Sequence, residues 1–484
     1  MGGGGAHLRV DPACDSGRLG PGFHADVDPS VSMLVSVPSR RNPASERPWV
    51  WLAVAGALML PRLILAIWWP AGGGDTPVYA AVAENILLNG CVSLSNPVVG
   101  DCVPHWGGNQ LPGYPAFLAL AWSVSRSTLV ALVAQGGIVV AATTWCGLCA
   151  AKLVGVRGGV VLALVVGLSP LTLPWSRYLL TDALAVASAL CVLAEVFRFL
   201  ADGRVRVVPL AAAFAAAVFL RYDALSLLLP VAIVMWRQRG MIAIAMCLAF
   251  LPVGAWWARS VEAGLGWLPP IGAMPDGGRA PSGYIAWGNG WMTDQYEYEG
   301  WFFPVSGRRY SEINLPAKAF GKDLVRVTML VQRMAEYDGA ELPEELDQQF
   351  KAIAQSQWRL VPARVWNMWF APYYSSGWPV SLRPPVGASV LELARAHPLA
   401  AVVKGGTALY RLGLIALAVA LAFVTTGWHR RVLLAVLAYA TLHTVSHAAF
   451  GFIDTRYLLG PAAILEAACV LALLGLRRAV PPRR

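Results

Sequence analysis

Charged residues are scarce in this sequence. Asp, Glu, Lys and Arg make up 14% of its 484 residues, whereas 57% are hydrophobic and the mean hydropathy is +0.54. A soluble domain carries about 25% charged residues, so a soluble protein of this length would lack the polar groups that cover its surface. The composition also excludes a disordered or collagen-like chain. It predicts a membrane protein, because the apolar residues fall into segments long enough to span a bilayer.

The motifs of several large enzyme and transporter classes are absent. The sequence holds no P-loop, no Gly-x-Ser-x-Gly and no His-Glu-x-x-His, so it lends no support to ATP-driven transport or common hydrolase chemistry. The net charge of +10 does not indicate a nucleic-acid partner. Most basic residues lie in short loops between apolar segments, where membrane topology accounts for them.

Ten apolar segments are predicted to span the membrane as helices, since their long runs of Leu, Val and Ala lack the alternation of a β-barrel. The expected fold is an all-α polytopic membrane protein with about ten transmembrane helices, outer juxtamembrane helices and a large outer loop segment. The segments are residues 49–69, 128–151, 158–177, 183–201, 207–222, 224–236, 240–259, 399–424, 432–450 and 457–476.

Lysine and arginine lie in every second loop, which predicts the orientation of the chain. By the positive-inside rule the basic loops and both termini are cytoplasmic, and the outer face carries 70–127 and 260–398. The same rule makes 111–125 a helix on the outer membrane surface, because a span there would invert every later loop. The basic loop residues are Arg40, Arg41, Arg47, Lys152, Arg157, Arg204, Arg206, Arg237, Arg239, Arg430 and Arg431.

The predicted organisation has five parts, in a protein of the plasma (inner) membrane. Residue Met33 is an alternative start within the first part, which shows no structural pattern. The parts are a disordered cytoplasmic tail (1–48), a membrane domain (49–259) that includes the first outer loop (70–127), a large outer loop or cap (260–398), C-terminal transmembrane helices (399–476) and a basic cytoplasmic tail (477–484).

Arginines and carboxylates recur together at the outer ends of predicted spans. Each motif taken alone is explained as a local ion pair or as an arginine that snorkels to the membrane surface. An aspartate at such a position is explained as a helix cap. Together they form a cluster suited to a lipid phosphate, with acidic groups that could bind a divalent cation or accept a proton. The motifs are Arg177 to Asp182, Arg221-Tyr-Asp223 and Asp454-Thr-Arg456, on the face that holds Asp75 after the run Gly72–Gly74.

Further polar groups lie within the predicted spans. Arg62 and Glu466 are costly there unless they are paired or face a wet cavity. His443 and His447 share a helix face and could bind a metal, but the sequence offers no evident third ligand, so hydrogen bonding inside the protein is favoured.

Two pairs of cysteines differ in their expected roles. Cys146 and Cys149 form a Cys-x-x-Cys inside a membrane helix and are interpreted as small packing residues. Cys91 and Cys102 both fall in the first outer loop, where they either form a disulfide that closes the loop or remain unpaired.

The order of these features resembles the C-type membrane glycosyltransferase superfamily. Within it the chain is most similar to the family-39-like group, which includes protein O-mannosyltransferases and lipid A aminoarabinose transferases. The resemblance covers roughly 49–476. The matching features are Asp75 with the helix through Glu84 and Leu88, the helix Leu111 to Ala119, the turn Tyr178 to Asp182, the segment Leu220 to Pro230, the stretch Trp287 to Pro304 and the turn Arg456 to Pro461.

The resemblance implies a sugar donor carried on a polyprenyl phosphate, and transfer with inversion to an acceptor on the outer face. Asp75 matches the catalytic base of the family, and Arg221 and Arg456 would stabilise the leaving phosphate. Asp182 and Glu84 would be second acidic residues, for a metal or for acceptor contact. The further candidates that it suggests are His105, Arg177, Asp223 and Tyr114.

Departures from the family pattern leave the use of a divalent metal and the identity of the sugar open. They are Asp75-Thr76 where many members have Asp-Glu, and Tyr222-Asp223 in place of Pro-Glu. The acceptor could be a lipid, a glycan or a protein. Two other functions remain as alternatives, a transporter or flippase for a lipid or lipid-linked sugar, and a glycan polymerase or ligase.

Overall fold

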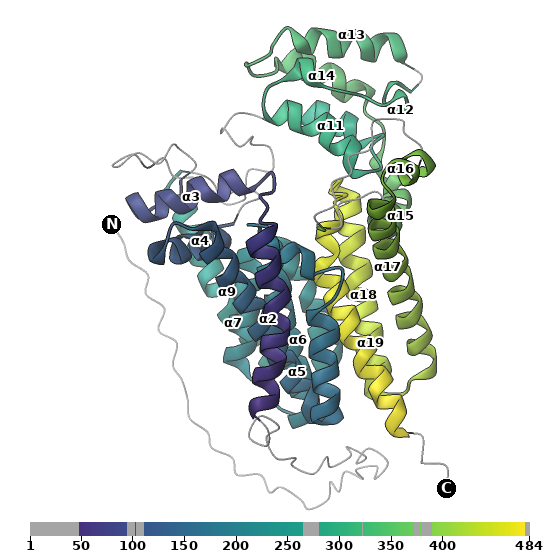
Figure 1. Ribbon diagram of the computed structural model, residues 1–484. Coiled ribbons are helices and arrows are strands. Elements are labelled where there is room, and N and C mark those ends of the chain that lie inside the picture. Colours follow the sequence, from purple (N-terminus) through teal and green to yellow (C-terminus); the bar gives the residue numbers. More distant parts are fainter. Residues whose placement is uncertain are drawn as a thin grey trace, which may run out of the picture. The chain divides into compact units, whose positions relative to one another are not determined.

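The computed structural model describes residues 48–93, 102, 111–264, 280–321, 323–371, 377–378 and 390–479. Over these residues the chain is almost entirely helical, and the one β-bridge joins Ala71 to Tyr178 (Figure 1). The prediction of an all-α protein is confirmed for this part of the chain. His105 and nearly all of the predicted tail 1–48 lie outside the described residues.

Long apolar helices alternate with short helices and turns, labelled as in Figure 1. The α-helices are α2 (Pro48–Trp68), α3 (Thr76–Asn89), α4 (Gly113–Val124), α5 (Thr128–Gly167), α6 (Thr181–Asp202), α7 (Val207–Leu220), α8 (Leu228–Met235), α9 (Arg239–Glu262), α10 (Ser282–Asn289), α11 (Gln295–Ser306), α12 (Ala317–Phe320), α13 (Leu324–Ala335), α14 (Glu344–Ile353), α15 (Val361–Phe370), α16 (Val390–Ala396), α17 (Pro398–Val424), α18 (Gly427–Phe450) and α19 (Leu459–Ala479). The 3-10 turns are η2 (Leu173–Arg177), η3 (Tyr222–Leu227), η4 (Trp236–Gln238), η5 (Tyr310–Glu312), η6 (Gln357–Leu360) and η7 (Thr455–Leu458).

Seven helical stretches in the described part of the chain are long and apolar enough to cross a membrane. They suggest a polytopic membrane protein, as the composition predicted. Ten separate spans stay a prediction, because several of the predicted segments are joined or shortened. The seven stretches are Pro48–Trp68, Thr128–Gly167, Thr181–Asp202, Tyr222–Glu262, Pro398–Val424, Gly427–Phe450 and Thr455–Leu476.

Helix α5 consists of two helical arms that fold back on each other. Gly155 breaks its helical backbone with φ 76° and ψ 165°, a conformation that favours glycine. A Cβ on Gly159 would lie 2.4 Å from the carbonyl oxygen of Gly147, and one on Gly167 would lie 3.1 Å from the side chain of Thr143. Residues 159 and 167 of the second arm thus meet residues 147 and 143 of the first. Since the numbers rise in one arm and fall in the other, the second arm runs back beside the first. The basic residues on either side of the turn therefore come to the same end.

Three predicted spans are shorter in the structure than in the sequence analysis. The segment 158–177 leaves the helix at Gly167, shortly before Pro170, which cannot donate to a continuing helix. The segment 207–222 becomes α7, with 14 residues. The segment 224–236 becomes η3 and the eight-residue helix α8. Since α7 rises about 21 Å and a bilayer core is about 30 Å thick, helix length alone does not give the number of crossings.

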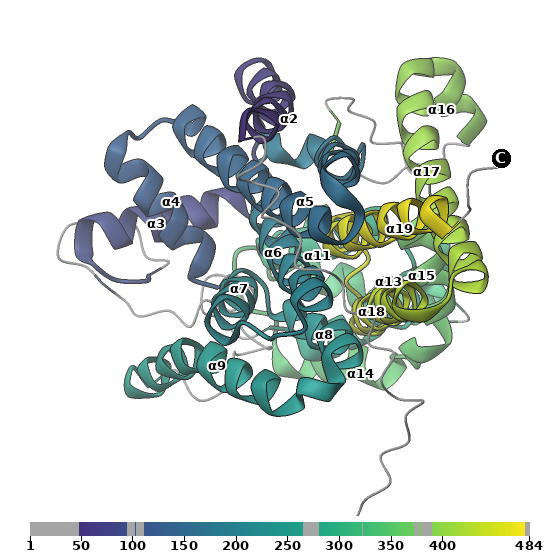
Figure 2. The same cartoon turned by 90° about the horizontal axis from the view of Figure 1, so that it is seen from below.

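Helix α6 lies in the middle of the bundle when it is viewed along the long helices (Figure 2). It packs against α5, α7, α8 and α19. Ala187 and Ala194 are buried in its contacts, as expected where small residues let membrane helices approach closely. The neighbouring helices are therefore positioned by their contacts with α6.

The Lys- and Arg-rich turns meet at one end of the bundle. Lys152 Nζ lies 2.8 Å from Asp202 Oδ2 at the last turn of α6, and Arg431 of α18 donates to the Ile233 carbonyl oxygen. Asp182 lies in the first turn of α6, about 30 Å along the helix from Asp202. The arginine–carboxylate motifs and the basic turns are thus separated, as the charge pattern requires. Assignment of the basic end to the cytoplasm stays a prediction.

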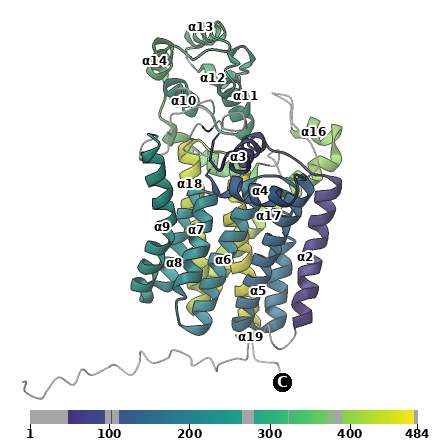
Figure 3. The ribbon, with the colours of Figure 1, turned by 90° about the vertical axis from the view of Figure 1, so that its left-hand side faces the viewer.

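Helices α3 and α4 pack together at the end of the bundle that carries Asp182 (Figure 3). Tyr79 of α3 and Tyr114 of α4 meet edge to face, with ring centroids 5.0 Å apart. A Cβ on Gly113 would lie 2.5 Å from the carbonyl oxygen of Phe219, so glycine is needed where α4 approaches the end of α7. With 12 residues, α4 is too short to span, as predicted.

Residues 280–371 form a group of short helices at this same end, drawn in green in Figures 1 and 3. Their core is aromatic, and Tyr284 and Trp301 stack with ring centroids 5.2 Å apart. Arg364 is buried, and its Nη1 donates to the Ala448 carbonyl oxygen at 2.8 Å, which ties the group to α18. The predicted cap therefore has a hydrophobic core, while its position outside the membrane stays a prediction.

Replacing Gly159 by alanine is expected to destabilise the α5 hairpin, because the new methyl group would lie 2.4 Å from Gly147 O. Overpacking of this kind costs about 1–3 kcal/mol. Gly137→Ala is the matched control in the same helix, since nothing lies within 4 Å of a Cβ there. Thermal unfolding of the purified proteins in detergent should give a lower midpoint for Gly159→Ala alone. Equal midpoints for both variants would contradict the hairpin.

Candidate functional site

Two loops distant in the sequence are joined at the Asp182 end of the bundle. The backbone N–H of Ala71 donates to Arg177 O at 2.9 Å, and Ala71 O accepts from the N–H of Leu179 at 3.3 Å. A Cβ on Gly73 would lie 2.8 Å from the side chain of Leu180. The glycine run thus lets one loop approach another.

Asp75 follows this run and forms an ion pair across the site. Its Oδ2 accepts a hydrogen bond from Arg456 Nη1 at 2.9 Å. Arg456 Nε lies 3.1 Å from Asp454 Oδ2, and the backbone N–H of Arg456 donates to Asp454 Oδ1 at 2.9 Å. One guanidinium therefore lies between carboxylates from the first and last parts of the described chain. Asp75 does not cap α3 with its side chain.

Arg221 forms the second centre of positive charge. Its Nη1 donates to Asp182 Oδ1 at 2.9 Å. Its Nη2 and Nε donate to Asp223 Oδ2 at 2.8 Å and 3.0 Å. The local pair with Asp223 forms as the motif predicts. Asp182, which the sequence grouped with Arg177, pairs with Arg221 instead, because the start of α6 lies beside the end of α7.

The ring of Tyr457 contacts both guanidinium groups. Its centroid lies 4.6 Å from the guanidinium carbon of Arg221 and 5.4 Å from that of Arg456, which is the range of cation–π contact. The three side chains line one cavity that opens to solvent. Its polar lining is Asp182, Arg221, Asp223, His443, Arg456 and Tyr457, and its remaining lining is Ala185, Ala189, Ala224, Leu227, Tyr439, Leu459, Gly460 and Pro461.

The carboxylates around the cavity differ in their access to solvent. The side chain of Asp75 is 33% exposed, whereas that of Asp182 is 2% exposed. Asp182 Oδ2 is buried and has no hydrogen-bond partner among the described residues. Such an atom loses its hydration without compensation, so it favours a donor or a cation supplied by a ligand. Asp75 is the most exposed of the four carboxylates, and it lies beside the cavity without lining it.

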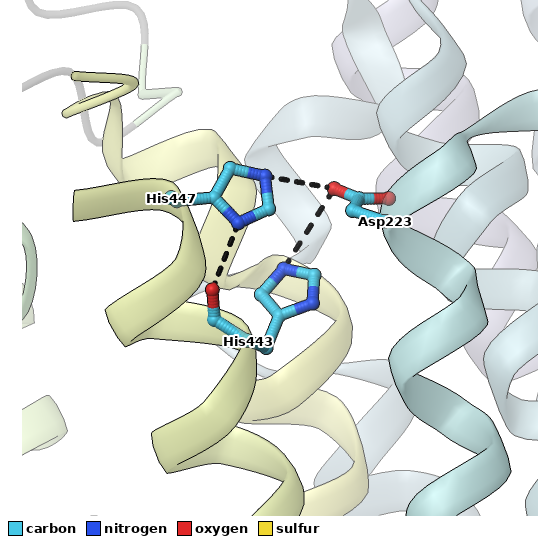
Figure 4. A group of neighbouring side chains, drawn as sticks. All are labelled: Asp223, His443 and His447. Carbon is cyan, nitrogen blue, oxygen red and sulfur yellow. Dashed lines mark hydrogen bonds and ion pairs between the residues drawn. The ribbon is translucent and has the colours of Figure 1, made fainter. Parts of the chain in front are cut away.

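Two histidines extend the site along α18 (Figure 4). His447 Nε2 lies 3.1 Å from Asp223 Oδ2, and His443 Nε2 lies 3.7 Å from the same oxygen. One donor atom from each of the three residues lies within 4.8 Å of the other two. The sequence showed the spacing of the histidines but no third donor. Asp223 follows α7 in the sequence, and the packing of η3 on α18 brings Asp223 to the two histidines.

Two predicted site residues lie outside the cavity and stabilise the scaffold. Arg177 is buried, and its Nη1 and Nε donate to the carbonyl oxygens of Trp69 and Gly377, both at 2.9 Å. Glu84 pairs with Arg126 at 3.3 Å on the protein surface. Neither residue lines the cavity.

Tyr114 is fully buried in the contact between α4 and α5. Its hydroxyl donates to Gln135 Oε1 at 3.0 Å. Burial raises the pKa of Tyr114 well above its usual range, with smaller effects from Tyr79 and Asp182. A phenol with a raised pKa stays protonated near neutral pH. In this structure Tyr114 positions α4 against α5 and does not line the cavity.

The two charged residues predicted inside spans form hydrogen bonds with neighbouring groups. Arg62 Nη1 and Nη2 donate to the carbonyl oxygens of Leu58 and Gly167 at 2.7 Å and 2.8 Å. Glu466 Oε1 accepts from Ser169 Oγ at 2.6 Å. Both contacts connect helices inside the bundle, and neither residue lines the cavity.

A disulfide joins Cys91 and Cys102, with their Cα atoms 6.4 Å apart. The structure thus contains the pairing that the sequence left open. Cys146 and Cys149 are buried free thiols in the first arm of α5, in agreement with a packing role.

Comparisons with known proteins do not assign a family. No model of a known protein family and no curated protein sequence matches this chain. Interpretation of the cavity therefore depends on the chemistry of its own residues.

Replacing Arg177 by glutamine is expected to lower stability, because two backbone carbonyls that it binds lose their donors. Each loss costs about 1–3 kcal/mol. Glu84→Gln is the control at another predicted site residue, since an exposed ion pair contributes only about 0–1 kcal/mol. Thermal unfolding midpoints of the purified variants measure the difference. A midpoint for Arg177→Gln equal to that of the wild type would refute the scaffold role.

Proposed function

We propose that this protein is an integral membrane glycosyltransferase. It moves a sugar from a polyprenyl-phosphate-linked donor to an acceptor at the end of the bundle that carries Asp75, with inversion of the anomeric carbon. That end lies on the outer side of the plasma membrane. The order of sequence motifs resembles the C-type membrane glycosyltransferase superfamily, and the arrangement of charges around the cavity supports the same chemistry.

The observation that carries the proposal is the pair of arginines that share one tyrosine ring. Arg221 and Arg456 come from different helix ends and line the same cavity. Guanidinium groups bind phosphate oxygens through short, charge-assisted hydrogen bonds, often in pairs. Both arginines lie where apolar helices end, which is where a lipid places its phosphate. A departing phosphate gains negative charge, and two fixed guanidiniums stabilise it as it does so.

The surroundings of the arginines suit a donor with a hydrocarbon chain. The remaining lining of the cavity is mostly alanine and leucine from α6, η3 and α19. A second, mainly apolar cavity of about 330 Å³ shares Leu459 with the first. Its lining is Leu171, Trp175, Thr407, Arg411, Thr455, Leu458, Leu459 and Ala462. An isoprenoid chain would gain the hydrophobic contacts of such surfaces while its phosphate meets the arginines.

Asp75 is the general base in this proposal. It is the most exposed carboxylate of the cluster and lies 2.9 Å from Arg456. The acceptor hydroxyl gives its proton to Asp75 as its oxygen attacks the anomeric carbon of the sugar. The new glycosidic bond forms while the bond to the phosphate oxygen breaks, and polyprenyl phosphate leaves with that electron pair. Arg456 links the two events, since it contacts the base and faces the phosphate.

Asp75→Asn should lower sugar transfer about 10²–10⁴-fold, because the amide cannot take the acceptor proton. Glu84→Gln is the matched control. It makes the same acid-to-amide change in the adjacent helix, at a surface ion pair outside the cavity. Both proteins are reconstituted in vesicles with polyprenyl phosphates that carry labelled sugars and with cell-envelope acceptors. Free polyprenyl phosphate and labelled product are then measured.

The comparison of the two variants decides between the functions. Loss of transfer in Asp75→Asn alone supports the proposed base. Equal transfer in both variants excludes Asp75 as the base. No transfer by the wild type, together with movement of labelled lipid between the leaflets, contradicts the transferase and favours a flippase.

Arg456→Lys should weaken the use of the donor about 10–100-fold, since a lysine keeps the charge but loses a charge-assisted hydrogen bond and its stacking on Tyr457. Arg126→Lys is the control at an exposed ion pair. The ratio kcat/KM for the donor, measured at saturating acceptor, reports the change. A value unchanged in Arg456→Lys would remove this residue from donor recognition.

A further inference from the structure

We infer that Asp223, His443 and His447 form a binding site for one divalent transition-metal ion of the zinc class. The two histidines lie one turn apart on α18, and Asp223 faces them from η3 (Figure 4). Asp223 Oδ2 lies 3.1 Å from His447 Nε2 and 3.7 Å from His443 Nε2. Two ligands of a tetrahedral zinc ion lie about 3.3 Å apart, since each is about 2.0–2.1 Å from the metal. The two distances to Asp223 are close to this spacing, and all three donors lie within 4.8 Å of one another.

The two ring nitrogens of His447 face two different oxygens. Its Nδ1 lies 2.9 Å from the backbone carbonyl oxygen of His443, which can only accept, so Nδ1 donates there. This leaves Nε2 as the nitrogen that faces Asp223 Oδ2. A metal ion bound by Nε2 and Oδ2 would replace their direct contact.

His443 has a serine as the partner of its Nδ1. Ser226 Oγ donates its one proton to the backbone carbonyl oxygen of Asp223. His443 Nδ1 lies 3.0 Å from Ser226 Oγ. Its Nε2 lies 2.9 Å from the Tyr457 carbonyl oxygen, which accepts a hydrogen bond from it, and 3.7 Å from Asp223 Oδ2. A metal ion on Nε2 would replace the hydrogen bond to Tyr457. Histidines that ligate a metal donate their other N–H to a fixed oxygen.

The charges of the surrounding cluster also favour a divalent cation. Asp75, Asp182, Asp223 and Asp454 supply four carboxylates, whereas Arg221 and Arg456 supply two guanidiniums. The carboxylates therefore outnumber the guanidiniums by two, and Asp182 is buried. Uncompensated charge is costly at the end of an apolar bundle. One divalent ion would balance the difference.

Two imidazole nitrogens and one carboxylate oxygen are ligands that zinc and similar ions prefer over magnesium or calcium. The ion would hold α18 against η3. It would thereby fix Asp223, which in turn binds two nitrogens of Arg221. The inference does not depend on the proposed sugar transfer, since metal binding is measured without donor or acceptor.

The test uses the full-length protein, purified in detergent with an affinity tag that contains no histidine. After removal of metals with a chelator, it is incubated with zinc, desalted and analysed by mass spectrometry for metal content. About one zinc ion per chain is expected for a site with three protein ligands. Cobalt in place of zinc should give the visible absorption bands of a tetrahedral complex. Zinc, but not magnesium, should raise the thermal midpoint of the metal-free protein.

Three variants locate the ion. The double variant His443→Ala/His447→Ala should retain no zinc above background. His429→Ala removes a histidine from the same helix outside the group and should keep full binding. Ser226→Ala removes the hydrogen-bond partner of His443 and should weaken zinc binding about 10–100-fold. A wild-type protein that binds no zinc overturns the inference whatever the variants do, and so does a double variant that binds it as tightly.

Discussion

Burial of charge at the end of an apolar bundle is the constraint on which the rest of this structure depends. Arg221 and Arg456 contact one tyrosine ring in a cavity among helix ends, where unpaired charges would be expensive. Each guanidinium is held by two carboxylates, and these come from different segments of the chain. The pairs therefore do more than neutralise charge. They determine which helix ends must lie together, and so they shape the polar cavity at this end of the bundle.

The scaffold that brings these ends together uses backbone contacts more than side-chain ion pairs. The reversal at Gly155 returns the chain to the end where α6 begins, and Arg62 binds a carbonyl at the close of the returning arm. A β-bridge then joins the loop before Asp75 to the loop before α6. Arg177 secures the same junction by binding carbonyl oxygens. Such contacts hold the loops at a fixed spacing. The guanidiniums of Arg221 and Arg456 therefore do not hold these two loops together by themselves, and they can contact a ligand in the cavity.

The carboxylates fall into two groups by environment, and the two environments suit different roles. Asp75 is reachable from solvent and pairs with a single arginine, which suits a residue that exchanges a proton with an acceptor. Asp223 lies beside two histidines and one arginine, where it suits a fixed structural or metal-binding role. The tyrosine ring lies between the two groups. A phosphate in the cavity would meet both arginines at once, so an ion bound by Asp223 would set the position of one of them.

Composition and loop charges were sufficient to predict a helical membrane protein and the separation of its basic turns from its arginine–carboxylate motifs. Those motifs predicted Asp182, Arg221, Asp223 and Arg456, which line the cavity. These properties follow from burial and from positive charge in nearby loops, which are local features of a sequence. The two spans that meet at Gly155 were predicted, but the shortness of α7 was not, because hydropathy does not register the packing that ends a helix. Only the tertiary structure decided that Asp182 pairs with Arg221, that Arg177 and Glu84 lie outside the cavity, and that Asp223 completes the histidine pair. Each of these depends on which helix ends become neighbours, and a single sequence holds no record of contacts between residues so far apart along the chain.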